Sequence, residues 1–291
     1  MNTRTLEYIL AVYETQSFIT ASEKCFVSQP ALSMQIKKFE DSLDIQIFER
    51  NSKNIIATKI GEEVIKQAYK ILEDVKNLKD LVSLHLDNGR INVSIGVIPT
   101  LGPYLMPNIL PPIKAKIPNI SISIVEEKTD TLIDMLEHGK LDFAILADNI
   151  ENRNFVTNKL FRDNFCLAIS TENQLSKGKD LSVKDIQEQN LMLLDEGHCM
   201  GDQALEFCST NKLSYNNNFR ASSLETLRQM VSVDEGITFI PKIAQTKTSK
   251  VKYIKIKNSD FHRNIYLVMR KSSTYSTLFK ELSKIISDNY K

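Results

Sequence analysis

The sequence has no long apolar run and no pattern of a secretory signal. No stretch of about 18 consecutive apolar residues occurs, which argues against a membrane-spanning helix. Residues 1–18 carry charges at Arg4, Glu7 and Glu14, and no apolar stretch leads into the small residues of a cleavage site. We therefore expect a cytoplasmic protein with no membrane partner.

Cysteine is scarce, and charge is almost balanced. Four cysteines in 291 residues are too few for a disulfide scaffold, and in a cytosolic chain a pair is more often catalytic, sensing or metal-binding. No Cys-x-x-Cys motif occurs and the histidines, at 85, 138, 198 and 262, are scattered, so we expect no metal and no cofactor. The charges of the 37 basic and 36 acidic residues nearly cancel. Any nucleic acid must therefore be bound by a local cluster of basic side chains.

The remaining composition is that of a globular chain. Hydrophobic residues make up 42% and charged residues 25%, which argues against a disordered, fibrous or membrane class. Repeats and low-complexity tracts are absent from the sequence. The length suits two or three domains.

Residues 1–57 predict short helices joined by tight turns. The expected helices run from about Thr5 to Thr15, from about Ile19 to Cys25 and from about Pro30 to Leu43. Ser28 stands just before the third helix, and serine is a preferred N-cap residue. Pro30 agrees with this helix start, because proline is tolerated in a first helical turn. This layout is that of a helix-turn-helix, whose third helix would lie in a DNA major groove.

Residues 59–87 predict a long helix with an apolar seam. Six apolar residues are spaced alternately four and three apart, with charged residues between them: Val64, Ala68, Ile71, Val75, Leu78 and Val82. Such a seam favours dimerisation through a coiled coil. The alternative is a single amphipathic helix lying on its own domain. The seam ends near His85, and Asp87, Asn88 and Gly89 predict a hinge.

From Ile91 onward, strands alternate with helices. Strands are expected at 91–98, 120–126, 141–146, 164–169, 191–194, 236–240 and 264–269, and helices up to 116 and at 131–138, 202–211, 223–233 and 274–288. The alternation predicts an α/β fold with a largely parallel sheet in two lobes. A cleft between two such lobes suits a small molecule.

The segment SFITASEKCFVSQPALSMQIKKFEDSLDIQIFER, residues 17–50, resembles the winged helix-turn-helix of LysR-type transcriptional regulators. The resemblance implies an all-α winged helix-turn-helix at 1–58, a coiled-coil linker and dimerisation helix at 59–88, and a two-lobed regulatory domain with a periplasmic-binding-protein-like fold at 89–291. Lobe I would comprise about 89–161 and 268–291, and lobe II about 162–267. The implied partners are double-stranded operator DNA, further copies of the chain in a dimer or dimer of dimers, and RNA polymerase.

Three further segments resemble the OxyR branch of that family, the hydrogen peroxide sensors. They are LLDEGHCMGDQALEFCSTNKL (193–213), FRASSLETLRQMV (219–231) and IGVIPTLGPYLMP (95–107). The resemblance implies a transcription activator of oxidative-stress genes, not an enzyme, in which peroxide oxidises Cys199 to a sulfenic acid that then forms a disulfide with Cys208. It also implies four residues that position peroxide: Thr100, Thr129, His198 and Asp202.

The position of Cys199 near a helix start would favour its reaction with peroxide. A helix expected to begin near Asp202 would place Cys199 at its N-terminus, where partial positive charge favours a thiolate, and His198 could supply a proton to the departing hydroxide. From Asp202 to Cys208 a helix rises about 9 Å, whereas a disulfide needs Cα atoms within about 7 Å. Oxidation should therefore unwind the segment. Related sequences commonly carry a basic residue where this chain has Gly201, which removes a local positive charge.

The DNA-binding residues implied by the motif lie on and after the third helix. They are Ser28, Gln29, Pro30, Ser33, Gln35, Lys37, Lys38, Arg50 and Lys53. Residues 1–58 hold six basic and seven acidic side chains, a net charge of −1, so DNA binding must depend on where the charges are placed.

Two alternative functions stay open at this point. A LysR-type regulator could sense a small metabolite in the interlobe cleft, and an unchanged peroxide response after Cys199→Ser would favour it. A thiol peroxidase would consume many equivalents of peroxide per chain, although the helix-turn-helix argues against turnover as the purpose. The other cysteines, Cys25 and Cys166, are interpreted as small buried hydrophobic residues.

Overall fold

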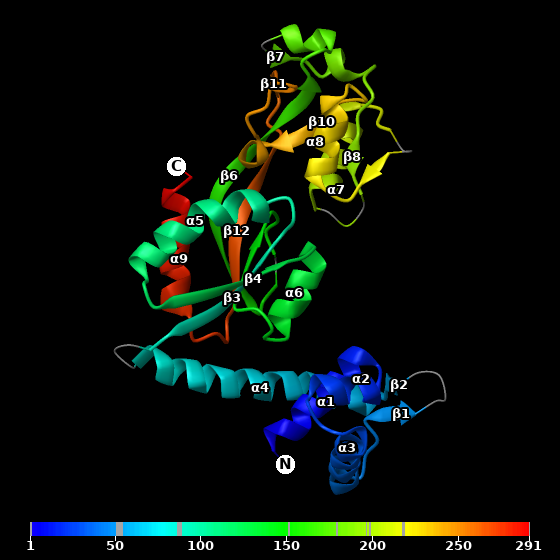
Figure 1. Cartoon of the computed structure of the whole chain (residues 1–291), viewed down its shortest axis with the longest axis vertical. Coiled ribbons are helices and arrows are strands. Elements are labelled where there is room, and N and C mark those ends of the chain that lie inside the picture. Colours follow the sequence, from blue (N-terminus) through cyan, green and yellow to red (C-terminus); the bar gives the residue numbers. More distant parts are fainter. Residues whose placement is uncertain are drawn as a thin grey trace. The chain divides into compact units, whose positions relative to one another are not determined.

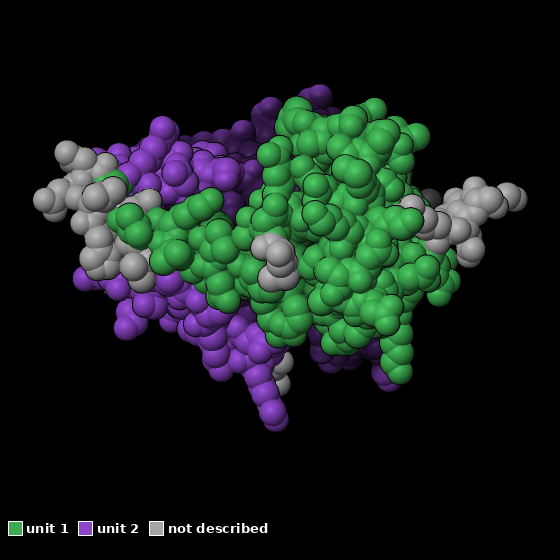
Figure 2. All heavy atoms as spheres, turned by 90° about the horizontal axis from the view of Figure 1, so that it is seen from below, with its two compact units in different colours: residues 1–89 green, residues 90–291 purple. Residues whose placement is uncertain are grey.

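The computed structural model describes residues 2–50, 55–85, 89–150, 152–178, 180–195, 197, 199–216 and 219–290, with the backbone alone at 50, 80, 81, 83–85 and 220. The chain forms two compact units, Met1–Gly89 and Arg90–Lys291 (Figure 2). Within the residues described, no helix is both long and apolar enough to cross a membrane.

Unit 1 is a helix-turn-helix followed by a hairpin and a long helix (Figure 1). Its elements are α1 (Thr3–Thr15), α2 (Phe18–Lys24), α3 (Gln29–Leu43), β1 (Phe48–Arg50), β2 (Ile55–Ala57) and α4 (Lys59–His85). The three predicted helices are confirmed to within two residues at each end. The wing is the antiparallel pair β1 and β2. The described part of α4 reaches His85, and the predicted hinge residues Asp87 and Asn88 lie outside the described residues.

Short-range chemistry sets the turns of unit 1. The Ser17 hydroxyl accepts a hydrogen bond from the Thr20 amide and caps α2, whereas Ser28 occupies the N-cap position of α3 without a side-chain cap bond. The buried carboxylate of Glu40 accepts from the amide of Ile47 at 2.7 Å and so fixes the entry to the hairpin. A Cβ on Gly61 would lie 2.1 Å from the Ile47 carbonyl oxygen, so only glycine permits this close approach of α4.

Unit 2 alternates strands and helices. Its first part contains β3 (Ile91–Val97), α5 (Gly102–Lys116), β4 (Ile120–Glu126), α6 (Thr129–Glu137), β5 (Phe143–Leu146) and β6 (Phe155–Ser170). The part that follows contains the short helices η1 (Gln174–Lys177), η2 (Lys184–Ile186) and η3 (Lys242–Ala244), the strands β7 (Asp180–Leu181), β8 (Leu193–Leu194), β9 (Arg220–Ala221), β10 (Thr238–Pro241), β11 (Val251–Ile256) and β12 (His262–Arg270), and the helices α7 (Cys199–Asn211), α8 (Leu224–Ser232) and α9 (Ser276–Asp288).

The main sheet is mixed, so the expectation of a largely parallel sheet is wrong. Its order is β4-β3-β5-β12-β6-β11-β7, with β10 also paired to β6. Parallel pairs lie toward its ends, but β12 runs antiparallel to both β5 and β6. The reason is that β6 and β12 both pass from one lobe to the other, in opposite directions.

Each lobe has its own apolar core. The lobe I core includes Phe161 of β6 and Ile265 of β12, and the lobe II core includes Phe165 of β6 and Ile256 of β11. The chain therefore changes lobe within β6 between Phe161 and Phe165, and returns before Ile265, a few residues earlier than the boundary at 268 inferred from the sequence. These two crossings carry the residues around which the candidate site is built.

Candidate functional site

Cys199 is the first residue of α7, three residues earlier than the helix start expected from the sequence. Its thiol is free. The side chain is partly buried and packs against the core of lobe I, although the rest of α7 contributes to the core of lobe II. Cys199 therefore lies where the two lobes meet.

Arg263 of β12 supplies a buried cation whose charge lowers the pKa of this thiol. Its side chain is fully buried, and its Nε donates to Oδ2 of Asp163 at 3.0 Å. Its Nη1 donates to the hydroxyl of Thr100 at 2.8 Å, and its Nη2 donates to the Thr100 carbonyl oxygen at 3.2 Å. Because Asp163 and Thr100 fix the guanidinium on two sides, the charge stays in place beside Cys199.

Thr129, the first residue of α6, faces the thiol with an unused hydroxyl. Its Oγ1 is buried and has no hydrogen-bond partner of proper geometry, yet it is close enough to Cys199 to lower the pKa of the thiol. A buried hydroxyl without a partner is costly. The position is therefore suited to a small polar molecule that supplies the missing partner.

Burial raises the pKa of the Cys199 thiol above its ordinary value, opposed first by the positive charge of Arg263. The hydroxyl of Thr129 and the amide of Met200 also lower it, whereas the carboxylate of Asp148 raises it. The sequence predicted a thiolate favoured by the helix N-terminus. In the structure, burial of the thiol raises its pKa by more than the neighbouring groups lower it. The group that lowers the pKa most is Arg263, a residue distant in sequence.

Gln203, one turn after Cys199 on α7, connects the helix to lobe I. Its Nε2 donates to Oδ1 of Asp148 at 3.2 Å and approaches the carbonyl oxygen of Ala147 at 3.4 Å. Burial raises the pKa of Asp148, while Gln203 and Arg263 lower it. The first turn of α7 is thus held to lobe I by a thiol contact and by a polar contact.

Cys208 is far from Cys199 along the same helix. It is 1% exposed in the lobe II core, and burial raises the pKa of its thiol to about 11. Nine helical residues rise about 13.5 Å, which exceeds the separation that a disulfide can span. The predicted separation of the two thiols is confirmed, and it is larger than expected because α7 begins earlier.

The structure groups only some of the predicted peroxide-positioning residues. Thr100 and Thr129 meet at Arg263 and Cys199, as described above. Asp202 lies in the first turn of α7 but is exposed, and its charge acts on Asp148. His198 lies outside the described residues. At Gly201, a Cβ would lie 3.2 Å from two backbone oxygens, so a larger residue would require a backbone shift.

The predicted DNA-contacting residues lie mostly on the exposed face of α3. Ser28, Gln29, Pro30, Gln35, Lys37 and Lys38 are exposed, and Ser33 is partly exposed. The opposite face of α3 is buried in the unit 1 core through Leu32, Ile36 and Phe39. At position 50 the backbone alone is described, and Lys53 lies outside the described residues. The exposed polar face agrees with insertion of α3 into a groove.

The seam of α4 divides into two halves. Ala68 is 1% exposed in the unit 1 core, and Val64 and Ile71 pack against that core, so these three residues follow the alternative of a helix lying on its own domain. Val75 is half-buried, whereas Leu78 and Val82 are 65% and 53% exposed. The unit's own core covers the methyl group of Ala68, and dimerisation through the seam stays a prediction. Among the described seam residues, Leu78 and Val82 are the most exposed.

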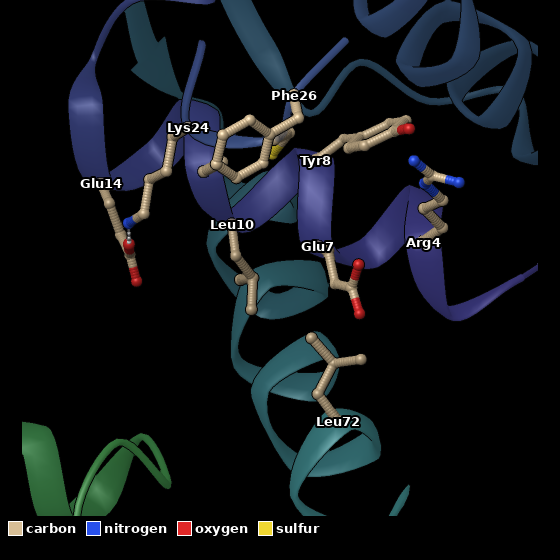
Figure 3. A pocket seen from close by; sticks show the side chains of 10 residues that line it. Arg4, Glu7, Tyr8, Leu10, Glu14, Lys24, Phe26 and Leu72 are labelled. Carbon is tan, nitrogen blue, oxygen red and sulfur yellow. Dashed lines mark hydrogen bonds and ion pairs between the residues drawn. The ribbon is translucent and has the colours of Figure 1, made fainter. Parts of the chain in front are cut away.

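Unit 1 also has a pocket of about 510 Å³ between α1, the turn after α2, and α4 (Figure 3). Phe26, at φ +55° and 94% exposed, overhangs it, and Lys24 bridges to Glu14 at its edge. None of the predicted DNA-contacting residues lines this pocket. Cys25 lines it and is half-buried, whereas Cys166 is buried as predicted.

Arg263 and Asp148 were missed by the sequence interpretation. A usable signal existed for Arg263, because Ile265 and Leu267 follow at the two-residue spacing that marks one face of a strand, and a charge on that inward face is unusual. Asp148 follows a buried strand and gave no such signal. Among the described residues, no group of three or more His, Cys, Asp or Glu side chains could hold a metal ion.

Comparison with known families agrees with this geometry. Residues 3–62 match the bacterial regulatory helix-turn-helix protein family, lysR type. Residues 88–291 match the LysR substrate binding domain. The division between these two matches falls close to the division between the two compact units.

Several relatives and solved structures are similar to the whole chain. A hydrogen peroxide-inducible genes activator of Haemophilus influenzae is 38% identical, over 100% of this chain and 98% of the relative. The DNA-binding transcriptional dual regulator OxyR of Escherichia coli is 36% identical, over 98% and 95%. A full-length OxyR variant of Pseudomonas aeruginosa superposes with a TM-score of 0.78 at 29% identity, over 98% and 94%. Reduced and oxidised OxyR structures give TM-scores of 0.62 at 33% and 34% identity, over 68% of this chain and 95% of theirs. The chain therefore belongs to the LysR family of bacterial regulators, in its OxyR branch.

Proposed function

We propose that this chain is a sequence-specific DNA-binding transcription regulator activated by hydrogen peroxide. The observation that carries the proposal is the placement of Cys199, whose thiol lies beside the fixed charge of Arg263 and the unpaired hydroxyl of Thr129. The relatives' names as peroxide-inducible gene activators support the same function.

The first chemical step is oxidation of the Cys199 sulfur. The thiolate attacks one oxygen of hydrogen peroxide, so that the S–O bond forms, the O–O bond breaks, and hydroxide leaves with the electron pair. The Arg263 charge stabilises the thiolate, and Thr100 and Thr129 offer hydroxyls where the peroxide oxygens would lie. The sulfur is oxidised by two electrons, and a sulfenic acid remains.

The second step joins Cys199 to Cys208. The Cys208 sulfur attacks the sulfenic sulfur, the S–S bond forms, the S–O bond breaks, and water leaves. Because α7 holds the two residues about 13.5 Å apart along its axis, the helix must unwind before this bond can close. Unwinding also removes the contact of Gln203 with Asp148, so oxidation changes how lobe II is held to lobe I.

Oxidation of the cysteines would change DNA binding and chain pairing, both of which belong to unit 1. The exposed face of α3 would read operator DNA, and the exposed Leu78 and Val82 would contribute to pairing of two chains, which would assemble further as a dimer of dimers. RNA polymerase would be the partner at activated promoters of oxidative-stress genes, and the cytoplasm is the proposed location. The chain would act stoichiometrically, as a sensor rather than an enzyme.

Peroxide titration of the full chain tests the proposal. Mass spectrometry after thiol alkylation should show one intramolecular bond between residues 199 and 208, together with an altered DNase footprint on operator DNA. The variants Cys199→Ser and Cys208→Ser should lose both changes, whereas Cys166→Ser should keep them. Failure of the unchanged chain to form this bond after stoichiometric oxidation would contradict the proposal. A peroxide response that survives Cys199→Ser would favour a metabolite sensor.

A further inference from the structure

Phe261, the residue just before β12, has an aromatic ring stacked on each of its faces. Its ring centroid lies 4.2 Å from that of Phe165 of β6, at an interplanar angle of 20°. On the other face, the ring of Phe207 of α7 lies 4.3 Å away at 16°. The ring of Phe239 of β10 meets Phe261 edge-on, at 5.1 Å and 84°. Phe261 is thus the central ring of a stack that joins α7 to the crossing strands.

The segment that carries Phe261 is fixed to the sheet. The Phe261 carbonyl oxygen accepts a hydrogen bond of 3.0 Å from the amide of Phe165. The Phe261 amide donates to the hydroxyl of Ser259 at 3.2 Å. The ring is therefore presented to α7 from a rigid backbone.

The stack connects the surroundings of the two cysteines. Phe207 directly precedes Cys208 on α7. At the other end, the guanidinium carbon of Arg263 lies 5.8 Å from the centre of the Phe165 ring, and the charge of Arg263 acts on Cys199. A hollow of about 370 Å³ opens between α7 and residues 258–262, lined by Gln203, Phe207 and Phe261 among others. Across this hollow, the ring of Phe207 connects the second half of α7 to Phe261.

Closing the 199–208 bond must disturb this stack. A continuous helix from Cys199 to Cys208 keeps their Cα atoms about 13.5 Å apart in rise, and the bond needs less than about 7 Å. Cys208 is also 1% exposed, so it has to leave its core position to reach the sulfenic sulfur. Its neighbour Phe207 moves with it and loses contact with Phe261.

We propose that Phe261 is a positioning residue for the redox switch, one that holds the Cys208 turn of α7 in its reduced conformation and so sets how readily the disulfide forms. The inference rests on the proposed function, because it presupposes that the 199–208 bond forms. Phe261 touches neither cysteine's reacting sulfur in this role. Its effect is on the equilibrium between dithiol and disulfide, not on the attack of Cys199 on peroxide.

The test uses the full chain equilibrated in reduced and oxidised glutathione buffers. Glutathione disulfide is the oxidant, and it yields two molecules of glutathione for each protein disulfide formed. The fraction of disulfide is read by mass shift after alkylation, for the unchanged chain, Phe261→Leu, Phe207→Leu and the double variant. Tyr290→Leu is the matched control, because Tyr290 stacks on Phe161 at 4.4 Å and 15° and packs against the lobe I core rather than that of lobe II.

Loss of the stack destabilises the reduced form selectively. Phe261→Leu should therefore raise the equilibrium constant for disulfide formation about fivefold, which corresponds to a midpoint about 20 mV more negative for a two-electron couple. Phe207→Leu should shift it similarly, and the double variant should shift it less than the sum of the two. Tyr290→Leu should leave the midpoint unchanged.

A second readout separates this role from general loosening of the fold. In a Cys208→Ser background, the rate at which peroxide generates a trappable sulfenic acid on Cys199 should be the same with and without Phe261→Leu. A midpoint of Phe261→Leu equal to that of the unchanged chain, or additive effects of the two phenylalanines, would overturn the inference while leaving the proposed function intact. Absence of any 199–208 bond in the unchanged chain would instead overturn the proposed function itself.

Discussion

The guanidinium of Arg263 donates a hydrogen bond of 2.8 Å to the hydroxyl of Thr100. Thr100 follows β3 in lobe I, and Arg263 lies near the start of β12, where the chain returns from lobe II. The bond fixes the cation at the junction of the lobes, where its charge lowers the pKa of the Cys199 thiol. The reactivity of the thiol therefore depends on a crossing strand as much as on its own helix.

Replacing Arg263 by Gln should slow the oxidation of Cys199. Loss of the cation removes the largest influence that lowers the pKa of the thiol, so a smaller fraction of Cys199 is thiolate at any given pH below that pKa. The pH dependence of Cys199 alkylation, measured in a Cys208→Ser background, should therefore move to higher pH. Arg263→Gln should also destabilise the fold by about 3–5 kcal/mol, because the buried Asp163 is left unpaired.

Arg263→Lys controls for charge in this comparison. Lysine keeps the cation but cannot donate to Asp163 and Thr100 together in the same geometry. The alkylation profile should therefore return toward that of the unchanged chain, while thermal stability recovers only in part. An identical profile for Arg263→Gln and the unchanged chain would show that the cation does not tune the thiol.

Thr129→Val should separate stability from reactivity. The hydroxyl is buried without a proper partner, so an isosteric methyl group should leave the denaturation midpoint unchanged or raise it. The same change removes a group that lowers the pKa of Cys199 and the hydroxyl proposed to bind peroxide. The second-order rate constant with peroxide should therefore fall about tenfold, as expected for the loss of one hydrogen bond to peroxide. Thr100→Val is the contrast, since it breaks the bond to Arg263 and should lower stability by about 1–3 kcal/mol. A marked loss of stability in Thr129→Val would argue against this assignment.

The helices of unit 1 could be predicted from the sequence because local signals determine them. Ser17 caps α2, Pro30 stands in the first turn of α3, and the apolar spacing of α4 matches its buried face. In unit 2, the first half of β6 and the whole of β11 were missed. Both strands depend on partners far away in sequence, β6 on β12 and β11 on β6, and such pairing leaves little local signature.

The candidate site shows the same division. Cys199 and Cys208 lie on one helix, and their motif identified them. Arg263 and Asp148 come from separate strands or from residues after them, and only the fold brings them to the thiol. The position of Cys199 against lobe I could not be predicted either, because it depends on the packing between the lobes.

Asp148→Asn should make Cys199 more reactive. The carboxylate raises the pKa of the thiol, whereas asparagine is neutral and still offers an oxygen to Gln203. Alkylation of Cys199 near pH 7 should therefore accelerate, by a factor that falls as the pH is lowered and the carboxyl of the unchanged chain is protonated. Unchanged rates across this pH range would contradict the idea.

Stability gives an independent measurement on the same variant. Burial raises the pKa of Asp148 in the folded chain, so the folded state holds this proton more tightly than the unfolded chain does. Ionisation at a pH above the raised value therefore costs stability. Asp148→Asn should be more stable than the unchanged chain near pH 7, and the difference should shrink as the pH falls through the pKa of the folded-state carboxyl.

Leu78→Glu should weaken pairing of two chains without unfolding unit 1. Leu78 is 65% exposed on the later part of the α4 seam, so a charge there costs nothing within one chain but is unfavourable between two apolar seams. Sedimentation should show a higher dissociation constant for the dimer, with an unchanged helical content. Ile56→Glu is the matched control, because Ile56 is 51% exposed on β2 and lies off the seam. Equal weakening by both variants would mean that general loss of exposed apolar surface, rather than the seam, governs assembly.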